Sequence, residues 1–244
     1  MEAVIEMKNV SFQAQNQTIV RDFSFQFEKG KVVALVGPSG SGKSTVLKLA
    51  AGLLVPASGD VFFQGRNLFM MTREQNLSFR KQAAMVFQDS ALWANQSLYQ
   101  ILELPLKLHF PQMDKQERDQ RMNDVLAQVG YRKALSVRPA QLSMGEQKLI
   151  AFARAMLCGP NLLFLDEWTE SLDDASAQCL VNLVWERRRN NDSIIFVSHD
   201  YTVIRYLADY IVMIVDGRFS QLFTREQVAQ DEDMAHLIEK RIAL

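Results

Sequence analysis

The chain has 244 residues, of which 48% are hydrophobic and 23% are charged, and its formal net charge is −1. A chain of this size can bury a large core, and its near-neutral charge argues against nucleic acid as the main partner. Residues 1–10 have no basic flank before an apolar run, so no signal peptide is expected. Cys158 and Cys179 stand far apart without nearby histidines, which favours buried thiols in a soluble, cytoplasmic protein.

Short apolar runs alternate with helical patterns along most of the chain. A strand is predicted over 31–36, and a Gly-rich turn leads from it into a helix over 43–54. Further strands, bounded by Gly, Asp or Ser, are predicted over 60–65, 83–87, 162–166, 193–200 and 210–223. The longest apolar runs are strand-sized and too short to cross a membrane. This alternation predicts an α/β fold.

The stretch 88–160 breaks the alternation, because it contains a charged helical segment over 113–130 and no convincing strand. A second helix is marked by Ser143 and Glu146, which have the spacing of a capping box, and by a Gly-Pro stop at 159–160. The N-terminus of that helix is a potential anion site. We predict one domain over 1–244, with a core over 1–88 and 160–224, a helical subdomain over 89–159 and a short helical tail over 225–244.

The strongest chemical signal has the spacing G-x-x-x-x-G-K-[ST] and lies between a predicted strand and a predicted helix. The glycines let the backbone wrap closely around phosphates, Lys43 neutralises their charge, and the Ser44 hydroxyl can bind Mg²⁺. The strand–loop–helix context makes a mere Gly-rich turn improbable as an explanation. The candidate phosphate-binding residues are Gly37, Pro38, Ser39, Gly40, Ser41, Gly42, Lys43, Ser44 and Thr45.

A second buried strand, "NLLFLDEW", runs into Asp166 and Glu167. Beside a phosphate-binding loop, such an aspartate would hold Mg²⁺ through water, and the glutamate would orient or polarise the attacking water. Alone, an apolar run that ends in Asp-Glu mostly marks the end of a strand. The pairing of the two motifs is specific.

With "SIIFVSHD", "TESLDD", "LSMGEQ" and Gln88 after "AAMVF", the chain resembles the nucleotide-binding subunit of ABC transporters over nearly its whole length. The resemblance implies an α/β P-loop NTPase (ABC ATPase) core with an inserted helical subdomain, and ATP and Mg²⁺ as cofactors. It also implies a homodimer with two composite ATP sites, in which Ser143 and Gly145 of one subunit face the γ-phosphate held by the other. The dimer would sit peripherally on the cytoplasmic face of the inner membrane and drive a separate permease, without contacting the substrate.

The same resemblance assigns roles to single residues. Glu167 would be the catalytic carboxylate, His199 would sense the γ-phosphate, and Gln88 would contact Mg²⁺ and water and relay to the permease. The nucleotide would also meet Asp173, and the metal would be held by Ser44, Gln88 and Asp166.

Several positions depart from the family pattern. Met144 replaces the first signature glycine, Glu146 replaces a glutamine, and Trp168 replaces a proline, but the phosphate-facing Ser143 and Gly145 persist. Ala14 stands where an aromatic residue usually stacks on adenine. Phe12, two residues earlier on the same strand face, fits either the core or a substitute platform.

The stretch 88–108 is similar to the ATPases of Mla and mammalian-cell-entry (MCE) type phospholipid transporters. Either a permease-contacting patch or core packing accounts for Leu92, Trp93, Leu98 and Tyr99. A small-solute importer ATPase and an envelope-remodelling ATPase are the alternatives. In the tail, one apolar face packs on its own subunit or crosses the dimer: Met234, Leu237, Ile238 and Ile242.

Non-transport ABC ATPases, as in DNA repair, usually carry two cassettes or a long coiled-coil insert, and neither is visible in the sequence. A nucleotide-dependent binding module without turnover would not need Lys43, Glu167 and His199 together. A transport ATPase with a separate permease is therefore the favoured class.

Overall fold

The computed structural model describes residues 2–230. Its centre is a six-stranded sheet of order β10-β9-β3-β8-β7-β6, in which five neighbouring strands are parallel. These five are β3 (Val32–Val36), β6 (Ala83–Val86), β7 (Leu162–Asp166), β8 (Ser193–Val197) and β9 (Tyr210–Val215). Every residue of β3, β7 and β8 is buried, as expected for parallel strands that are covered on both faces.

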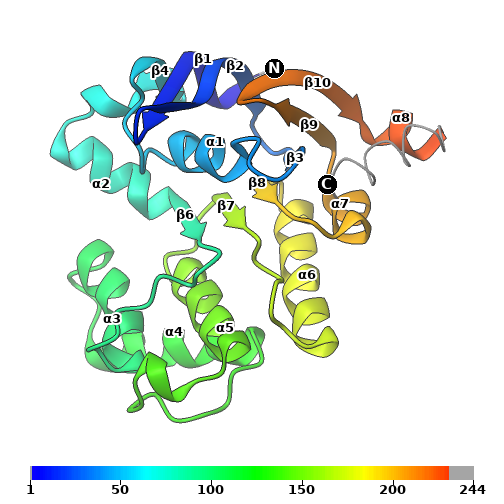
Figure 1. Cartoon of the computed structure of the whole chain (residues 1–244). Helices are drawn as coiled ribbons and strands as arrows, with labels where there is room; N and C mark the ends of the chain where they lie inside the picture. Colours follow the sequence, from blue (N-terminus) through cyan, green and yellow to red (C-terminus); the bar gives the residue numbers. More distant parts are fainter. Residues whose placement is uncertain (1, 231–244) are drawn as a thin grey trace.

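The second sheet is antiparallel, with the order β2-β1-β4-β5. Its strands are β1 (Ala3–Ala14), β2 (Gln17–Glu28), β4 (Ser58–Phe63) and β5 (Arg66–Asn67). Helix α1 (Lys43–Ala50) lies between the two sheets, where Val46, Leu47 and Leu49 are fully buried (Figure 1). The bounds of β1 and β2 were not predicted, although Phe12 and Ala14 were placed on one strand face; several register shifts between the two strands interrupt their pairing.

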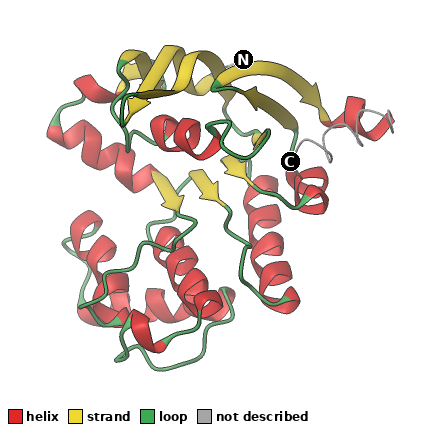
Figure 2. Cartoon of the chain, in the orientation of Figure 1, coloured by secondary structure: helices red, strands yellow, loops and turns green. Residues whose placement is uncertain are grey.

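Between β5 and β6 the chain forms the 3₁₀ turn η1 (Leu68–Met70) and helix α2 (Arg73–Gln82). Between β6 and β7 it forms α3 (Leu98–His109), α4 (Lys115–Gln128), the 3₁₀ turn η2 (Pro139–Gln141) and α5 (Met144–Met156), with no strand. The helical group formed by α3, α4 and α5 lies below the central sheet in the view of Figure 2. The helices α6 (Asp174–Arg189), α7 (Tyr201–Leu207) and α8 (Arg225–Gln230) complete the described chain.

One hydrophobic cluster joins the helical group to the central sheet. Side chains of α3, α4 and α5 pack with Val86 of β6, Leu165 of β7 and Leu180 of α6. The helical group is therefore attached by apolar packing as well as by its two chain connections. The predicted boundaries at residues 89 and 159 remain a prediction.

Most predicted elements are confirmed with small shifts at their ends. The predicted strand 210–223 is instead a hairpin of β9 and β10 (Arg218–Thr224), because Asp216 (φ 50°) and Gly217 (φ 74°) form a tight turn. The helix predicted over 43–54 ends at Ala50. Four tail residues lie outside the described residues: Met234, Leu237, Ile238 and Ile242.

The structure separates two of the residues for which a permease-contacting patch and core packing were the alternatives. Leu98 is 0% exposed at the start of α3 and packs in the core, so it cannot contribute to an exposed patch, whereas Trp93 is 48% exposed. One expectation needs correction. Cys158 and Cys179 are free thiols but half-buried rather than buried. Among residues 2–230, no helix is long and apolar enough to span a membrane.

Candidate functional site

The loop predicted to bind phosphate connects the buried end of β3 to the N-terminus of α1. Gly37 has a φ of 149°, and a Cβ there would lie 2.0 Å from the carbonyl oxygen of Ile214, so this position accepts only glycine. Gly42, in the left-handed region (φ 95°), precedes α1 and offers no side-chain cap. The first backbone N–H groups of α1 therefore stay available to an anion.

Lys43 begins α1 and is nearly buried. Its ammonium donates hydrogen bonds to the carbonyl oxygens of Gly37 (2.8 Å) and Pro38 (3.0 Å). Burial lowers the pKa of Lys43, and the nearby carboxylates of Glu167 and Asp166 oppose that shift. A buried cation at the mouth of a Gly-rich loop is suited to phosphate oxygens.

Asp166 ends β7 directly beside this loop and is 0% exposed. Its Oδ1 accepts a hydrogen bond from the Ser44 hydroxyl (2.7 Å), while its buried Oδ2 has no hydrogen-bond partner and lies 3.9 Å from the Lys48 ammonium. Burial raises the pKa of the Asp166 carboxyl. Such a buried, incompletely satisfied carboxylate is suited to a cation or to a water held by one.

Glu167 follows in the left-handed conformation (φ 44°), which is unusual for a non-glycine residue. Its side chain is held by His199, whose backbone N–H donates to Oε2 (3.2 Å) and whose Nε2 lies 3.2 Å from Oε1. Burial raises the pKa of the Glu167 carboxyl, and the neighbouring His199 opposes this. The carboxylate is thus buried, aimed by a histidine and made more basic than usual.

Gln88 is exposed just beyond β6, and its side-chain amide donates to a carboxylate oxygen of Glu170 (3.1 Å). β6 is the neighbour of β7 in the sheet, so the two loops that carry Gln88 and Glu167 meet at one edge. The parallel strands thus bring together residues that lie far apart in the sequence.

A cavity of about 490 Å³ collects most of these groups. Among the predicted residues it is lined by Ser39, Gly40, Gly42, Lys43, Ser44, Thr45, Gln88, Glu167 and His199. Two further lining residues, Gln17 and Ile19 of β2, were missed by the sequence analysis. The sequence holds no motif for them, because only the packing of β2 over the loop brings them there.

Phe12 packs against the hydrophobic cluster between the sheets, and Ala14 pairs with Gln17 at the β1–β2 turn. Neither residue lines the cavity. Of the two alternatives for Phe12, the structure therefore shows packing against the core.

Ser143, Gly145 and Asp173 do not line that cavity. Ser143 caps α5: its hydroxyl accepts from the Glu146 N–H (3.2 Å), and the Glu146 carboxylate accepts from the Ser143 N–H (3.0 Å). The predicted capping box is confirmed. Lys133 pairs with Glu146 and holds the pKa of that carboxyl below its usual range.

The loop after Glu167 packs against α5. A Cβ on Gly145 would lie 3.0 Å from the Ser171 carbonyl oxygen, and the fully buried Trp168 ring packs against Phe152. Asp173 then caps α6, because its carboxylate accepts from the backbone N–H and the hydroxyl of Ser176 (both 2.9 Å). These contacts fix the loop within its own chain.

Comparisons with known proteins agree on one family. The family model described as "ABC transporter" matches residues 20–170, more than half of the chain. The ATP-binding protein MlaF of the intermembrane phospholipid transport system of Haemophilus influenzae is 32% identical over 95% of this chain and 88% of its own length. The methionine import ATP-binding protein MetN 3 of Pectobacterium atrosepticum is 30% identical over 92% of this chain and 66% of its own length. The macrolide export ATP-binding/permease protein MacB of Haemophilus ducreyi is 32% identical over 89% of this chain but only 32% of its own length.

Among solved structures, a dimeric ATP-binding cassette in a post-hydrolysis state with ADP and Pi superposes with a TM-score of 0.83 and 25% identity. The match covers 91% of this chain and 98% of that chain. The fold is therefore that of an ABC ATPase: a P-loop NTPase core with helices inserted between β6 and β7. The chain belongs to the ABC transporter family, as one of its ATP-hydrolysing subunits.

Proposed function

We propose that this ATPase binds MgATP in the cavity of Lys43 and Glu167, and that two copies close over two ATP molecules to drive a separate membrane permease. The observation that carries the proposal is one site in which the phosphate-binding Lys43 and the His199-held Glu167 line the same cavity. The assembly would lie on the cytoplasmic face of the membrane. A solved cassette dimer of this fold supports the pairing of two subunits.

Within the site we assign roles from position and chemistry. The loop N–H groups and Lys43 bind the β- and γ-phosphates, because these donors face the cavity. Glu167 accepts a proton from the attacking water, and its burial and raised pKa suit it to act as a base near neutral pH. His199 aims the carboxylate, and Gln88 contributes an amide at the same edge.

The residues present fit Mg²⁺ bound together with a nucleotide. Within residues 2–230, no group of three or more His, Cys, Asp or Glu side chains could hold a metal ion by itself. Ser44, Asp166 and Gln88 instead provide oxygen atoms, and the orphaned Oδ2 of Asp166 is the strongest of these signs. Mg²⁺ usually keeps several waters and uses one or two carboxylates together with phosphate oxygens, where it neutralises charge.

Ile19 is the candidate surface for adenine. It is half-buried, it lines the cavity, and its carbonyl lies close to Gly42 at the start of α1. Aliphatic contact would then replace aromatic stacking, while Phe12 stays in the core. Asp173 and the partner's Ser143 and Gly145 would approach the nucleotide only across the dimer.

Phospholipid is the substrate class that we favour. The phospholipid-transport relative aligns over 95% of this chain and 88% of its own length. The unmatched remainder of that relative is too short to contain a permease. The stretch 88–108 supports the same group. A small-solute importer is the second candidate, because the methionine import relative is nearly as similar.

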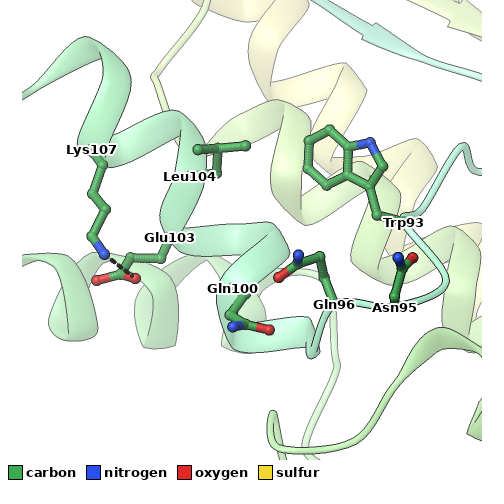
Figure 3. Close-up of a pocket in the computed structure, with 7 residues that line it drawn as sticks. All are labelled: Trp93, Asn95, Gln96, Gln100, Glu103, Leu104 and Lys107. Atoms are coloured by element: carbon green, nitrogen blue, oxygen red, sulfur yellow. Dashed lines mark ion pairs between the residues drawn. The ribbon is translucent and has the colours of Figure 1, made fainter.

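We place the permease contact in a groove of about 430 Å³ on the helical group (Figure 3). The groove is lined by Trp93, Asn95, Gln96, Gln100, Glu103, Leu104 and Lys107. Trp93 and Leu104 are each 48% exposed, and the Glu103–Lys107 ion pair (2.8 Å) borders them. Arg154 stacks over Trp93 and donates to the Ala91 carbonyl (2.7 Å), which joins the groove to the segment after Gln88.

The test is purification of the full chain from native membranes, followed by reconstitution with the permease that accompanies it. Phospholipid transfer between vesicles that requires ATP would support the lipid assignment. A permease that pairs with a solute-binding protein and ignores lipid would refute it and leave the ATPase in place. The variant Trp93→Glu/Leu104→Glu should release the permease, whereas Met70→Glu/Val55→Glu, at apolar residues that are exposed outside the groove, should not.

A further inference from the structure

Helix α5 carries a buried lysine that the proposed mechanism does not use. Lys148 is 3% exposed, and its ammonium donates to the backbone carbonyl oxygens of Phe87 (3.4 Å), Gln88 and Glu167 (3.2 Å). Gln88 and Glu167 lie just past the ends of the neighbouring strands β6 and β7. One side chain therefore connects three segments: α5, the loop after β6 and the loop after β7.

The arrangement is costly for a merely structural contact. Among the residues that the structure describes, Lys148 has no carboxylate within ion-pair distance, so its three donors are spent on main-chain carbonyls. A buried ammonium is tolerated only when it is well hydrogen-bonded, and an apolar side chain of similar length would fill the same space at lower cost. A cation at this point is therefore expected to serve the site.

Lys148 and His199 hold Glu167 from two sides. Lys148 binds the main-chain carbonyl of this left-handed residue, while His199 contacts its carboxylate. Lys148 likewise binds the main chain of Gln88, whose side chain stays free to leave Glu170. The main chain of Gln88 and that of Glu167 are thus both bonded to the same residue of α5, Lys148.

We propose that Lys148 is a positioning residue for ATP hydrolysis, which fixes the backbone of Gln88 and Glu167 to the helix that presents Ser143. The assignment rests on the proposed role of Glu167. Any movement of α5 on dimer closure would displace the Gln88 and Glu167 segments together. Lys148 touches neither nucleotide nor water in this role.

The first test is Lys148→Met in the full chain, which keeps the length of the side chain and removes its donors. We expect kcat for ATP hydrolysis to fall about 10- to 100-fold, because small misplacements of catalytic groups have effects of this size. KM and the affinity for a fluorescent ATP analogue should change by less than about twofold, since the phosphate-binding loop is untouched. Lys148→Arg should recover part of kcat, because its guanidinium also donates to carbonyls. Lys115→Met, at an exposed lysine of α4, is the control.

The second test does not depend on activity. Amide hydrogen exchange in the nucleotide-free Lys148→Met chain should become faster in both 86–90 and 166–170, because the main chain of each segment accepts a hydrogen bond from this side chain. Ile150→Ala, buried two residues further along α5, is the control for a general loss of stability, and the melting temperature of both variants is measured alongside. If Lys148→Met does not fold, Lys148→Gln is used with the same readouts.

Unchanged kcat in folded Lys148→Met, unchanged exchange in either segment, or an equal kcat loss in Ile150→Ala would each overturn the proposal. The failure of the proposed function would look different. If Glu167→Gln hydrolysed ATP at the wild-type rate, the role of Glu167 would be wrong while the exchange result stood.

Discussion

Two helix N-termini are expected to meet phosphate in this protein, and they are built in opposite ways. At α1, Gly42 leaves the first N–H groups open, and the adjacent Lys43 is a buried cation. At α5, Ser143 and Glu146 satisfy each other's backbone N–H groups, and Lys133 neutralises Glu146. The first end is ready to bind an anion within one subunit. At the second end the Glu146 N–H is already bonded to the Ser143 hydroxyl, and we expect this end to meet phosphate only from a partner subunit.

The largest effect is expected on ATP hydrolysis, when a variant holds the dimer closed with the N-terminus of α1 in one subunit facing the N-terminus of α5 in the other. Glu167→Gln should bind MgATP normally but lose about 10²- to 10⁴-fold in kcat, because an amide is a poor base. The closed dimer should then accumulate, as measured by size-exclusion chromatography with MgATP and by phosphate release. A variant that stays monomeric and still turns over at the wild-type rate would contradict both the role of Glu167 and the composite site.

Breaking the open end should abolish nucleotide binding. Lys43→Ala removes the buried cation and the hydrogen bonds that we expect it to donate to the phosphates, each of which contributes about 1.5–3 kcal/mol when charge-assisted. The dissociation constant for ATP should rise at least about 100-fold, at 1.4 kcal/mol per tenfold. Equilibrium titration measures this, with Lys115→Ala as a surface control. Unchanged affinity would refute the phosphate-binding role.

The capped end can be tested against a matched cap. Ser97 caps α3 with Gln100 in the same type of capping box as Ser143 with Glu146. Ser143→Ala and Ser97→Ala should each lower the free energy of unfolding by about 1 kcal/mol. In the Glu167→Gln background, only Ser143→Ala should weaken ATP-dependent dimerisation, by about tenfold.

Analytical ultracentrifugation with and without MgATP separates the two contributions of Ser143. Equal dimerisation in both serine variants would show that Ser143 acts as a helix cap alone.

The smallest effect is expected on the free energy of unfolding of the nucleotide-free chain, which the buried carboxylate of Asp166 lowers when it is charged. Burial raises the pKa of Asp166, so the folded state binds this proton more tightly than the unfolded state does. Stability is therefore lost as the pH rises from the usual Asp range through the folded pKa. Asp166→Asn should stabilise the nucleotide-free chain at pH 7, and the gain should shrink toward pH 4.

Urea unfolding at the two pH values checks this prediction. Asp119→Asn is the control of opposite sign: the Tyr99 hydroxyl lowers the pKa of the Asp119 carboxyl, so that variant should lose stability at pH 7. A destabilised Asp166→Asn chain at pH 7 would show that the hydrogen bond from Ser44 outweighs the burial of charge.

The local sequence predicted features that depend on neighbouring residues. The phosphate-binding loop, the strand that ends in Asp166, the capping box of Ser143 and the strand-free stretch 88–160 all follow from short spacings and apolar runs. The family motifs also indicated most of the residues that line the cavity, but not Gln17 and Ile19. For Leu98 the sequence left both core packing and an exposed patch open, because an apolar residue at the start of a helix has the same local pattern whether it faces the core or solvent; the structure shows core packing.

The sequence by itself therefore determined the family and the ATP chemistry and indicated candidate residues for the open phosphate site, because those depend on glycine geometry, one lysine and two carboxylates at set spacings. Only the tertiary structure decided that Ile19 lines the nucleotide cavity, that Phe12 belongs to the core and that Lys148 joins the segments of Gln88 and Glu167. These contacts link residues tens of positions apart, through strand order and helix packing. No local sequence pattern predicts these contacts, because each side chain is equally compatible with its own strand or helix whether or not the distant contact forms.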